Sequence, residues 1–423
     1  MHASRIREAD SPLSRGGRVS RLPAFGALRY RNFRLLWAGL TVSAVGTWMQ
    51  IVAQSLLVLD LTHGSATALG TVSLAQALSF LLFAPAGGGA ADRFDKRRLL
   101  LLTQGILMGF AVLLGVLTAT GAIRFWMIPL VAFGSGATLS FDQPARNALI
   151  ASLVPKENLM NAIALQSAVF NGASILGSAL AGLALSKVGY SGNFFLNATS
   201  YFAVLAALLL LHTPAVLGAM RSAGNLLESV RESLRYIRRD AVLPSVVAAY
   251  GALLFFGPSA ALMLPLFARQ VLRVGPAQLG MLFSAVGAGT VLGALILASA
   301  GDLKFKGRLV FGSILLWMAS LAVFALSNSL PVAVPALFIL GAAQNTAGAM
   351  TITLLQMRVP PEMRGRAMSL NTLLIMCVRP LGDFPAGAVI AGLGFRPTAL
   401  ISVLIVGVVW LVVLACRPAI RSA

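Results

Sequence analysis

The sequence predicts an all-α membrane protein of about twelve transmembrane helices arranged as two six-helix bundles. Three observations carry this prediction. The 423 residues have a mean hydropathy of +0.85, and only 11% of them are charged, against roughly 25% in soluble domains. Apolar segments of membrane-spanning length recur along the chain. Finally, the second half of the chain repeats residues of the first half.

Each predicted helix is an apolar segment of about 20 residues, the length that crosses the hydrocarbon core. In chain order the segments are residues 35–59, 66–90, 99–121, 125–143, 161–186, 193–212, 242–268, 278–300, 309–327, 331–355, 367–392 and 398–416. So many apolar segments could not all be buried in a soluble core of this length. They define a basic tail at 1–34, bundles at 35–212 and 242–416, a linker at 213–241 and a second tail at 417–423.

Two stretches of the first half recur in the second half. The segment Val154–Gly182 recurs 205 residues later as Val359–Gly387, with matching Pro, Glu, Leu and Gly positions. The segment Leu69–Arg98 recurs 210 residues later with its Asp, Lys and Arg positions. Chance matches in an apolar chain would involve mainly Leu and Ala, so these matches indicate duplication. Two homologous halves predict bundles related by a near two-fold axis along the membrane normal.

The net charge of +20 indicates membrane topology, not nucleic-acid binding. If the amino terminus is cytoplasmic, 27 of the 33 Lys and Arg residues fall on that side of the membrane and five on the other. This distribution is the positive-inside pattern. We therefore expect a multi-pass protein of the cell (inner) membrane with both termini cytoplasmic and with its basic loops on anionic lipid headgroups. The basic first 34 residues contain no apolar run, so we expect no cleavable secretory peptide.

Residues suited to catalysis or metal binding are scarce. Cys377 and Cys416 fall in predicted spans, and the three His residues have no ligand spacing, so we expect no metal site and no cofactor. No clustered nucleophile and base is present to support an enzyme. The sequence contains no phosphate-binding loop, so we do not expect this chain to power transport by hydrolysing ATP itself. Within the linker, apolar residues at helical spacing from Asn225 to Asp240 predict an amphipathic helix on the cytoplasmic surface.

A family resemblance rests on the loop between the second and third predicted spans. The segment Gly88–Arg98 reads Gly-Gly-Ala-Ala-Asp-Arg-Phe-Asp-Lys-Arg-Arg. It resembles the Gly-x-x-x-Asp-Arg-x-Gly-Arg-Lys/Arg signature of the major facilitator superfamily. Segments 33–37, 46–49 and 141–146 are similar to the branch that contains enterobactin exporters and macrolide efflux pumps. The resemblance covers residues 29–414 and implies the major facilitator fold and transport by alternating access.

Two departures from the family pattern bear on mechanism. Asp95 stands where many relatives have Gly, although Asp is familiar in this branch. Ser178 follows Gly177 where a Gly-Pro pair marks many proton-linked exporters. The second departure leaves proton antiport an open question.

The resemblance also implies a latch in which Asp92, with Lys96 and Asp142, holds one face of the transporter shut. The charges of this loop can bridge neighbouring helix ends without any family argument. A role in fixing the membrane topology would explain the basic residues Arg93 and Arg97. It would not explain the carboxylates at the membrane edge. Glycines around Gly88 allow close packing on a partner, which in the family is a helix of the other half. The predicted latch residues are Gly88, Asp92, Arg93, Lys96, Arg97 and Asp142.

The few polar residues inside the predicted spans are candidates for a cavity or for coupling. Arg379 and Asp383 are four residues apart, so they share a helix face and can neutralise each other. A substrate or proton site and a self-satisfied structural pair are equal alternatives. Amides can bind polar substrates or join helices. The candidates are Gln50, Gln54, Gln76, Gln166, Asn171, Asn345, Asn371, Arg379 and Asp383.

These predictions favour a secondary active transporter that exports a moderately large amphipathic organic molecule, such as a siderophore or an antibiotic. Protons are the candidate coupling ion. A nutrient or metabolite importer of the same fold is the alternative, because two rocking halves can run in either direction. An integral membrane lipid-processing protein is the third class. The expected partners are a small-molecule substrate and membrane lipids, and not nucleic acid; a monomer is what the resemblance implies.

Overall fold

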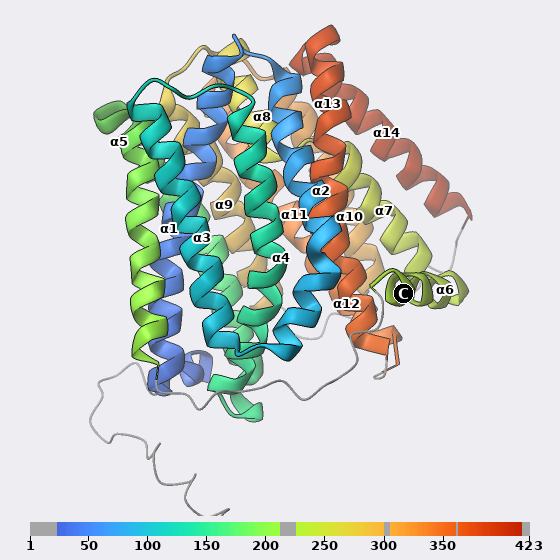
Figure 1. Ribbon diagram of the computed structural model, residues 1–423. Helices are drawn as coiled ribbons and strands as arrows, with labels where there is room; N and C mark the ends of the chain where they lie inside the picture. The colour runs from blue at the N-terminus through green and yellow to red at the C-terminus, as the bar shows by residue number, and fades with distance from the viewer. Residues whose placement is uncertain (1–22, 212–225, 300–304, 361–362, 417–423) are drawn as a thin grey trace, which may run out of the picture.

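The chain is a helical bundle built from two halves (Figure 1). The computed structural model describes residues 23–211, 226–299, 305–360 and 363–416, and these contain no β-strand. The predicted tail 417–423, most of the tail 1–34 and part of the linker lie outside the described residues. The N-terminal half holds α1 (Arg31–Leu61), α2 (Ala66–Arg93), α3 (Lys96–Ala119), α4 (Met127–Leu153) and α5 (Lys156–Leu210), preceded by the 3₁₀ turn η2 (Pro23–Arg29).

The α5 helix supplies two membrane spans. It is 55 residues long, about twice what one span requires. Gly189 interrupts it with a φ of 66° and a ψ of −166°, a conformation that glycine adopts without a Cβ clash. The chain therefore reverses at Gly189, and α5 accounts for the fifth and sixth predicted spans of this half.

The C-terminal half repeats this plan with two broken spans. Its helices are α7 (Leu243–Phe256), α8 (Ala260–Phe267), η3 (Ala268–Leu272), α9 (Pro276–Ser299), α10 (Lys306–Leu326), α11 (Leu330–Arg358), α12 (Arg364–Leu373), η5 (Leu374–Val378), α13 (Arg379–Leu393) and α14 (Phe395–Cys416). The span α7–α8–η3 breaks at Gly257–Ser259, where the sequence predicted one continuous helix. The π-helical turn η5 interrupts the span α12–η5–α13, and such turns are frequent at functional sites.

Ten described helices are long and apolar enough to cross a membrane. Counting α5 twice and adding α4, which is 27 residues long, gives about twelve crossings. The sequence predicted that the fourth helix would end at residue 143, but α4 continues to Leu153 through Pro144. Arg146, beyond the predicted end, pairs with Asp142, which is itself hydrogen-bonded to α3. The duplicated segments 154–182 and 359–387 lie on the fifth span of each half, as the duplication requires.

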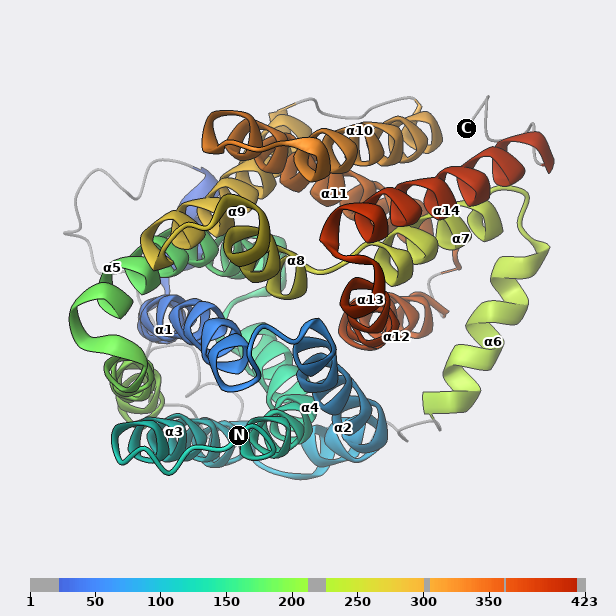
Figure 2. The same cartoon turned by 90° about the horizontal axis from the view of Figure 1, so that it is seen from above.

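The two halves meet along two pairs of helices. The α5 helix packs along α9, and α2 packs along α13 (Figure 2). We call the end of the bundle that carries the α2–α3 turn the basic face, and the end that carries the α1–α2 turn the opposite face (Figure 1). Close contacts between the halves lie near the opposite face. A methyl group added at Gly70 of α2 would lie 2.8 Å from the Asp383 carbonyl oxygen, so glycine permits this approach.

The predicted amphipathic linker helix is α6 (Leu226–Arg239), and it packs on the C-terminal half beside α12 and α7. Asp240 anchors its end, since Oδ1 accepts hydrogen bonds from the backbone amides of Val242, at 2.7 Å, and Leu243, at 2.9 Å. Arg358 lies 3.4 Å from the same carboxylate. Partial burial opposes ionisation of Asp240, but these amides and Arg358 outweigh it and lower the pKa. The contacts that hold α6 therefore come from the C-terminal half.

Candidate functional site

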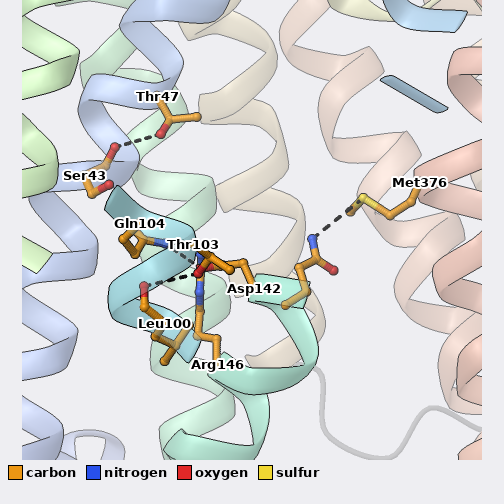
Figure 3. Close-up of polar contacts among 9 residues, drawn as sticks. Ser43, Thr47, Leu100, Thr103, Gln104, Asp142, Arg146 and Met376 are labelled. Carbon is orange, nitrogen blue, oxygen red and sulfur yellow. Dashed lines mark hydrogen bonds and ion pairs between the residues drawn. The ribbon is translucent and has the colours of Figure 1, made fainter. Parts of the chain in front are cut away.

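A buried polar cluster joins α3 and α4 inside the N-terminal half (Figure 3). The Asp142 side chain is fully buried and accepts hydrogen bonds from Thr103 Oγ1 at 2.9 Å and from Gln104 Nε2 at 2.7 Å. Arg146, one helical turn along α4, donates to the other carboxylate oxygen. We call Asp142, Arg146, Thr103 and Gln104 the Asp142 cluster. It places one carboxyl group inside the N-terminal half with three donors around it.

The Asp142 cluster is electrostatically self-contained. A carboxylate in a low-dielectric interior is costly unless it is paired and hydrogen-bonded. Arg146 supplies the opposite charge, and its side chain is 23% exposed, so its own desolvation is incomplete. Within the described part of the chain, all partners of Asp142 belong to the N-terminal half. In this conformation Asp142 therefore does not bridge the two halves.

The glycines of the α2 signature pack differently from the family-based expectation. Gly87 is the residue in close contact, and its partner is the Ser140 backbone of α4, which belongs to the same half. A methyl group added at Gly88 or Gly89 would meet no atom within 4 Å. The signature glycines therefore let α2 approach α4, because the backbone of α4 lies directly beneath Gly87. They do not mediate an approach to the other half.

The remaining latch residues lie at the start of α3 and the end of α2. Arg97 binds the carbonyl end of α5, with Nε 2.6 Å from Leu208 O and Nη2 2.8 Å from Leu209 O. Cationic donors stabilise the free carbonyls of a helix C-terminus. Lys96 is buried and Arg93 exposed. Asp92 is half-buried and forms no ion pair or hydrogen bond with any residue that the structure describes.

Arg379 and Asp383 share one face of α13 but bind different partners. Asp383 is buried, and its Oδ1 accepts a hydrogen bond from the Ser259 amide at 2.9 Å. Ser259 begins α8, so Asp383 stabilises the break between α7 and α8. Arg379 Nη2 donates to Gln344 Oε1 at 3.2 Å. Within the described residues the two side chains form no ion pair, because each finds a partner on another helix.

The predicted cavity amides are spread over both halves. Gln50 Oε1 accepts a hydrogen bond from Asn197 at 2.6 Å, which joins α1 to α5. The amide oxygens of Gln166 and Asn371 are buried without a hydrogen-bond partner. The side chains of four further candidates form no hydrogen bond with any described residue; they are Gln54, Gln76, Asn171 and Asn345. The structure therefore joins Gln50 to the helix packing, and the other amides form no side-chain hydrogen bond within the described residues.

A polar bridge that the sequence did not predict connects the halves at the opposite face. Arg269 Nη1 of η3 lies 2.7 Å from Asp60 Oδ1 of α1, and Tyr190 of α5 donates to Oδ2. Asp60 lies at the C-terminal end of α1, where the helix dipole disfavours an acid. Arg269 and Tyr190 compensate for this position. Isolated charges near the span ends on the side with few Lys and Arg were the available signal, but the spacing of 209 residues concealed the pair.

Among the described residues there is no group of three His, Cys, Asp or Glu side chains that could hold a metal ion. The polar groups are instead distributed over several helices, with the Asp142 cluster inside the N-terminal half and Asp383 beside the contact between α2 and α13. Such an arrangement suits binding and release of a solute, with rigid bundles moving about a shared interface.

Two packed bundles with an internal repeat and buried polar residues define a major facilitator transporter. The model of the family described as "Transmembrane secretion effector" matches residues 22–422 of this chain, which therefore belongs to that family. The chain is 27% identical over 391 residues to the enterobactin exporter EntS of Escherichia coli, covering 90% of this chain and 91% of the relative.

Two other relatives are transporters by name. The macrolide efflux protein A of Streptococcus pyogenes is 23% identical, over 84% of this chain and 89% of its own length. The MFS-type transporter YfiS of Bacillus subtilis is 26% identical, over 79% of this chain and 81% of its own length. The relatives therefore match along most of the chain, including both halves.

Solved structures confirm the fold. A bacterial homologue of the human lysosomal transporter Spinster, described as inward-facing and unoccupied, superposes with a TM-score of 0.71 at 15% identity. The match covers 95% of this chain and 98% of that chain. A POT family transporter in complex with 5-aminolevulinic acid superposes with a TM-score of 0.74 at 13% identity, covering 92% and 96% of the two chains.

Proposed function

We propose that this transporter exports a moderately large, amphipathic organic molecule by alternating access. The observation that carries the proposal is similarity along nearly the whole chain to an exporter of enterobactin and to a macrolide efflux protein. The molecules in those names are bulky compounds with polar and apolar parts. The buried amides of both halves support the same class, because they bind polar groups without requiring charge on the solute.

The proposal includes an orientation. We place the basic face and both termini in the cytoplasm of a bacterial inner membrane, and we treat the functional unit as a monomer. The distribution of Lys and Arg supports this orientation. Labelling of single cysteines introduced at Arg93, on the basic face, and at Ala122, in the α3–α4 turn, tests it. A membrane-impermeant maleimide added to intact cells should label position 122 and leave position 93 unlabelled.

The substrate and direction are tested in cells with and without the gene. We expect cells that express the transporter to retain less of at least one compound in a panel of siderophores, macrolides and dyes. A protonophore added to the same cells should raise retention if protons drive export. Greater uptake of a nutrient by the expressing cells, with no change in the panel, would favour import and contradict the proposal.

The contacts between halves support a cycle that begins with the opposite face closed. Near that face Gly182 of α5 allows close approach to α9, since a methyl group there would lie 2.6 Å from Pro276 O. The Asp60–Arg269 bridge lies at the same end of the bundle. Opening the opposite face requires these contacts to separate. A closed opposite face agrees with the inward-facing description of the Spinster homologue that the chain resembles in fold.

Loss of the Asp60–Arg269 bridge is expected to favour the conformation that is open at the opposite face. Both side chains are more than one-third exposed, so the bridge contributes at most about 1 kcal/mol and Asp60→Asn should shift the equilibrium about fivefold or less. Spin labels on Ala122 and Gln278, one in each half, would report a larger population of long distances. Arg124→Gln removes a charge from the same face without touching the bridge and should leave the distances unchanged. If the distances between the labels in Asp60→Asn are distributed as in the wild type, the bridge does not help to close the opposite face.

We propose that Asp92 forms its latch contact in the other conformation, when the basic face closes. Asp92→Asn is therefore expected to slow export while leaving the folded protein intact, because Asp92 has no ionic partner here and exposed pairs contribute roughly 0–1 kcal/mol. Transport per molecule, normalised to protein in the membrane, is the measurement. Glu157→Gln, an exposed acid on the same face, is the control. Equal rates in both variants would rule out the latch.

A further inference from the structure

An apolar groove opens toward the membrane on the outside of the N-terminal half. It has a volume of about 480 Å³ and runs between α2 and α3, with α4 beneath it. Both α2 and α3 pack on α4 but scarcely on each other. Its walls include Phe83 of α2, Phe94 directly after α2, and Leu102 and Ile106 of α3, which are 38% to 61% exposed. The groove is therefore a lipid-facing depression and lies outside the interface between the halves.

The length of the groove matches one leaflet of the bilayer. Its α3 wall extends from Arg98 to Ile106 and its α2 wall from Phe94 back to Phe83. At 1.5 Å per residue these walls are about 12 and 16 Å long. Half of the hydrocarbon core is about 15 Å thick. Because both walls begin at the basic face, the groove spans the leaflet on that side.

Arg98 gives the groove a charged end. It is the basic residue of the groove wall, in the first turn of α3. Its guanidinium forms no hydrogen bond or ion pair with the part of the chain that the structure describes, whereas neighbouring Arg97 is bound to the end of α5. A cation free of protein partners at the level of the headgroups attracts an anionic group there. The other walls are apolar and suit an acyl chain.

We propose that this groove binds an anionic phospholipid of the leaflet on the basic face, with its phosphate at Arg98 and an acyl chain between α2 and α3. Thr103 lines the groove and also donates a hydrogen bond to Asp142. The bound lipid therefore lies one side chain away from the buried carboxylate of the Asp142 cluster. The proposal does not depend on which solute is transported.

The test uses a fluorescent bimane label in the groove of the full-length protein. In a variant carrying Cys377→Ser and Cys416→Ser, Leu102→Cys provides the labelling position, and Leu404→Cys on exposed α14 provides the reference. The protein is placed in phosphatidylcholine vesicles, and quenching by brominated phosphatidylglycerol is compared with quenching by brominated phosphatidylcholine at equal mole fraction. We expect a preference for phosphatidylglycerol about fivefold greater at position 102 than at position 404, the effect of one basic residue at the headgroups.

Three variants of the labelled protein decide the outcome. Arg98→Gln should reduce the preference at position 102 to that at position 404. Arg93→Gln, which removes an exposed charge from the same turn but not from the groove, should leave it unchanged. Ala90→Leu, which narrows the groove, should reduce quenching by both lipids. The proposal is overturned if positions 102 and 404 show equal preference, or if Arg93→Gln lowers the preference as much as Arg98→Gln does.

Discussion

Asp142→Ala is expected to destabilise the protein strongly. The change leaves Arg146, Thr103 and Gln104 without their shared acceptor in a buried site. Removing one partner of a buried ion pair costs about 3–5 kcal/mol. Because Arg146 is partly exposed, we expect the lower end of that range. Thermal unfolding in detergent, followed by the loss of monodisperse protein, measures the difference.

Asp92→Asn is a control outside the Asp142 cluster, and a double variant separates charge from packing within it. Asp92→Asn removes an acid that has no ionic partner in the described residues, and it should unfold at the wild-type temperature. The double variant Asp142→Asn with Arg146→Gln keeps hydrogen-bonding groups of similar size but removes both charges. It should be more stable than Asp142→Ala, because no uncompensated charge remains buried. Equal unfolding temperatures for Asp142→Ala and Asp92→Asn would show that the cluster contributes nothing to stability.

The fold was predictable because membrane spans are specified locally. Length and hydropathy place a span wherever about 20 apolar residues occur together, and the repeat at 205 residues assigned the spans to two equivalent halves. The end of α4 was not predictable in this way. Arg146 lies beyond the predicted span, but it pairs with Asp142, and α3 supplies Thr103 and Gln104 to hold that carboxylate inside the bundle. Such compensation depends on a different helix and leaves no local pattern.

Pairings between distant helices were the least predictable part of the site. Spacing alone favoured an Arg379–Asp383 pair, but the backbone of Ser259 and the Gln344 amide bind these side chains instead. The break that exposes the Ser259 amide follows Gly257-Pro258, and a Gly-Pro pair inside an apolar run is a recognisable signal for it. The Asp60–Arg269 bridge has no comparable signal, because its members lie in different halves.

The contacts of Asp383 bear on proton coupling, for which a carboxylate must be able to exchange its proton as the halves move. Asp383 lies at the junction of the halves, where its own backbone meets Gly70 of α2. Its side chain binds a neutral amide and does not form an ion pair with Arg379 in the described structure. A buried carboxylate without a direct ion pair is costly, and a proton removes its charge. We therefore propose Asp383 as the proton carrier, in preference to Asp142, which Arg146 neutralises.

Asp383→Asn is expected to abolish substrate-driven proton movement while preserving exchange of the substrate across the membrane. The amide oxygen of Asn can still accept the Ser259 hydrogen bond, so the break between α7 and α8 should persist. Proteoliposomes containing a pH-sensitive dye and the substrate found in cells measure the first quantity, and radiolabelled counterflow measures the second. Glu157→Gln, which removes an exposed acid on the basic face, should retain both activities. Proton movement that persists in Asp383→Asn would eliminate Asp383 as the carrier and leave Asp142, Asp60 or transport without proton coupling. Loss of both counterflow and proton movement would instead assign Asp383 a structural role. A transporter that has lost only its proton-binding group should still exchange substrate across the membrane.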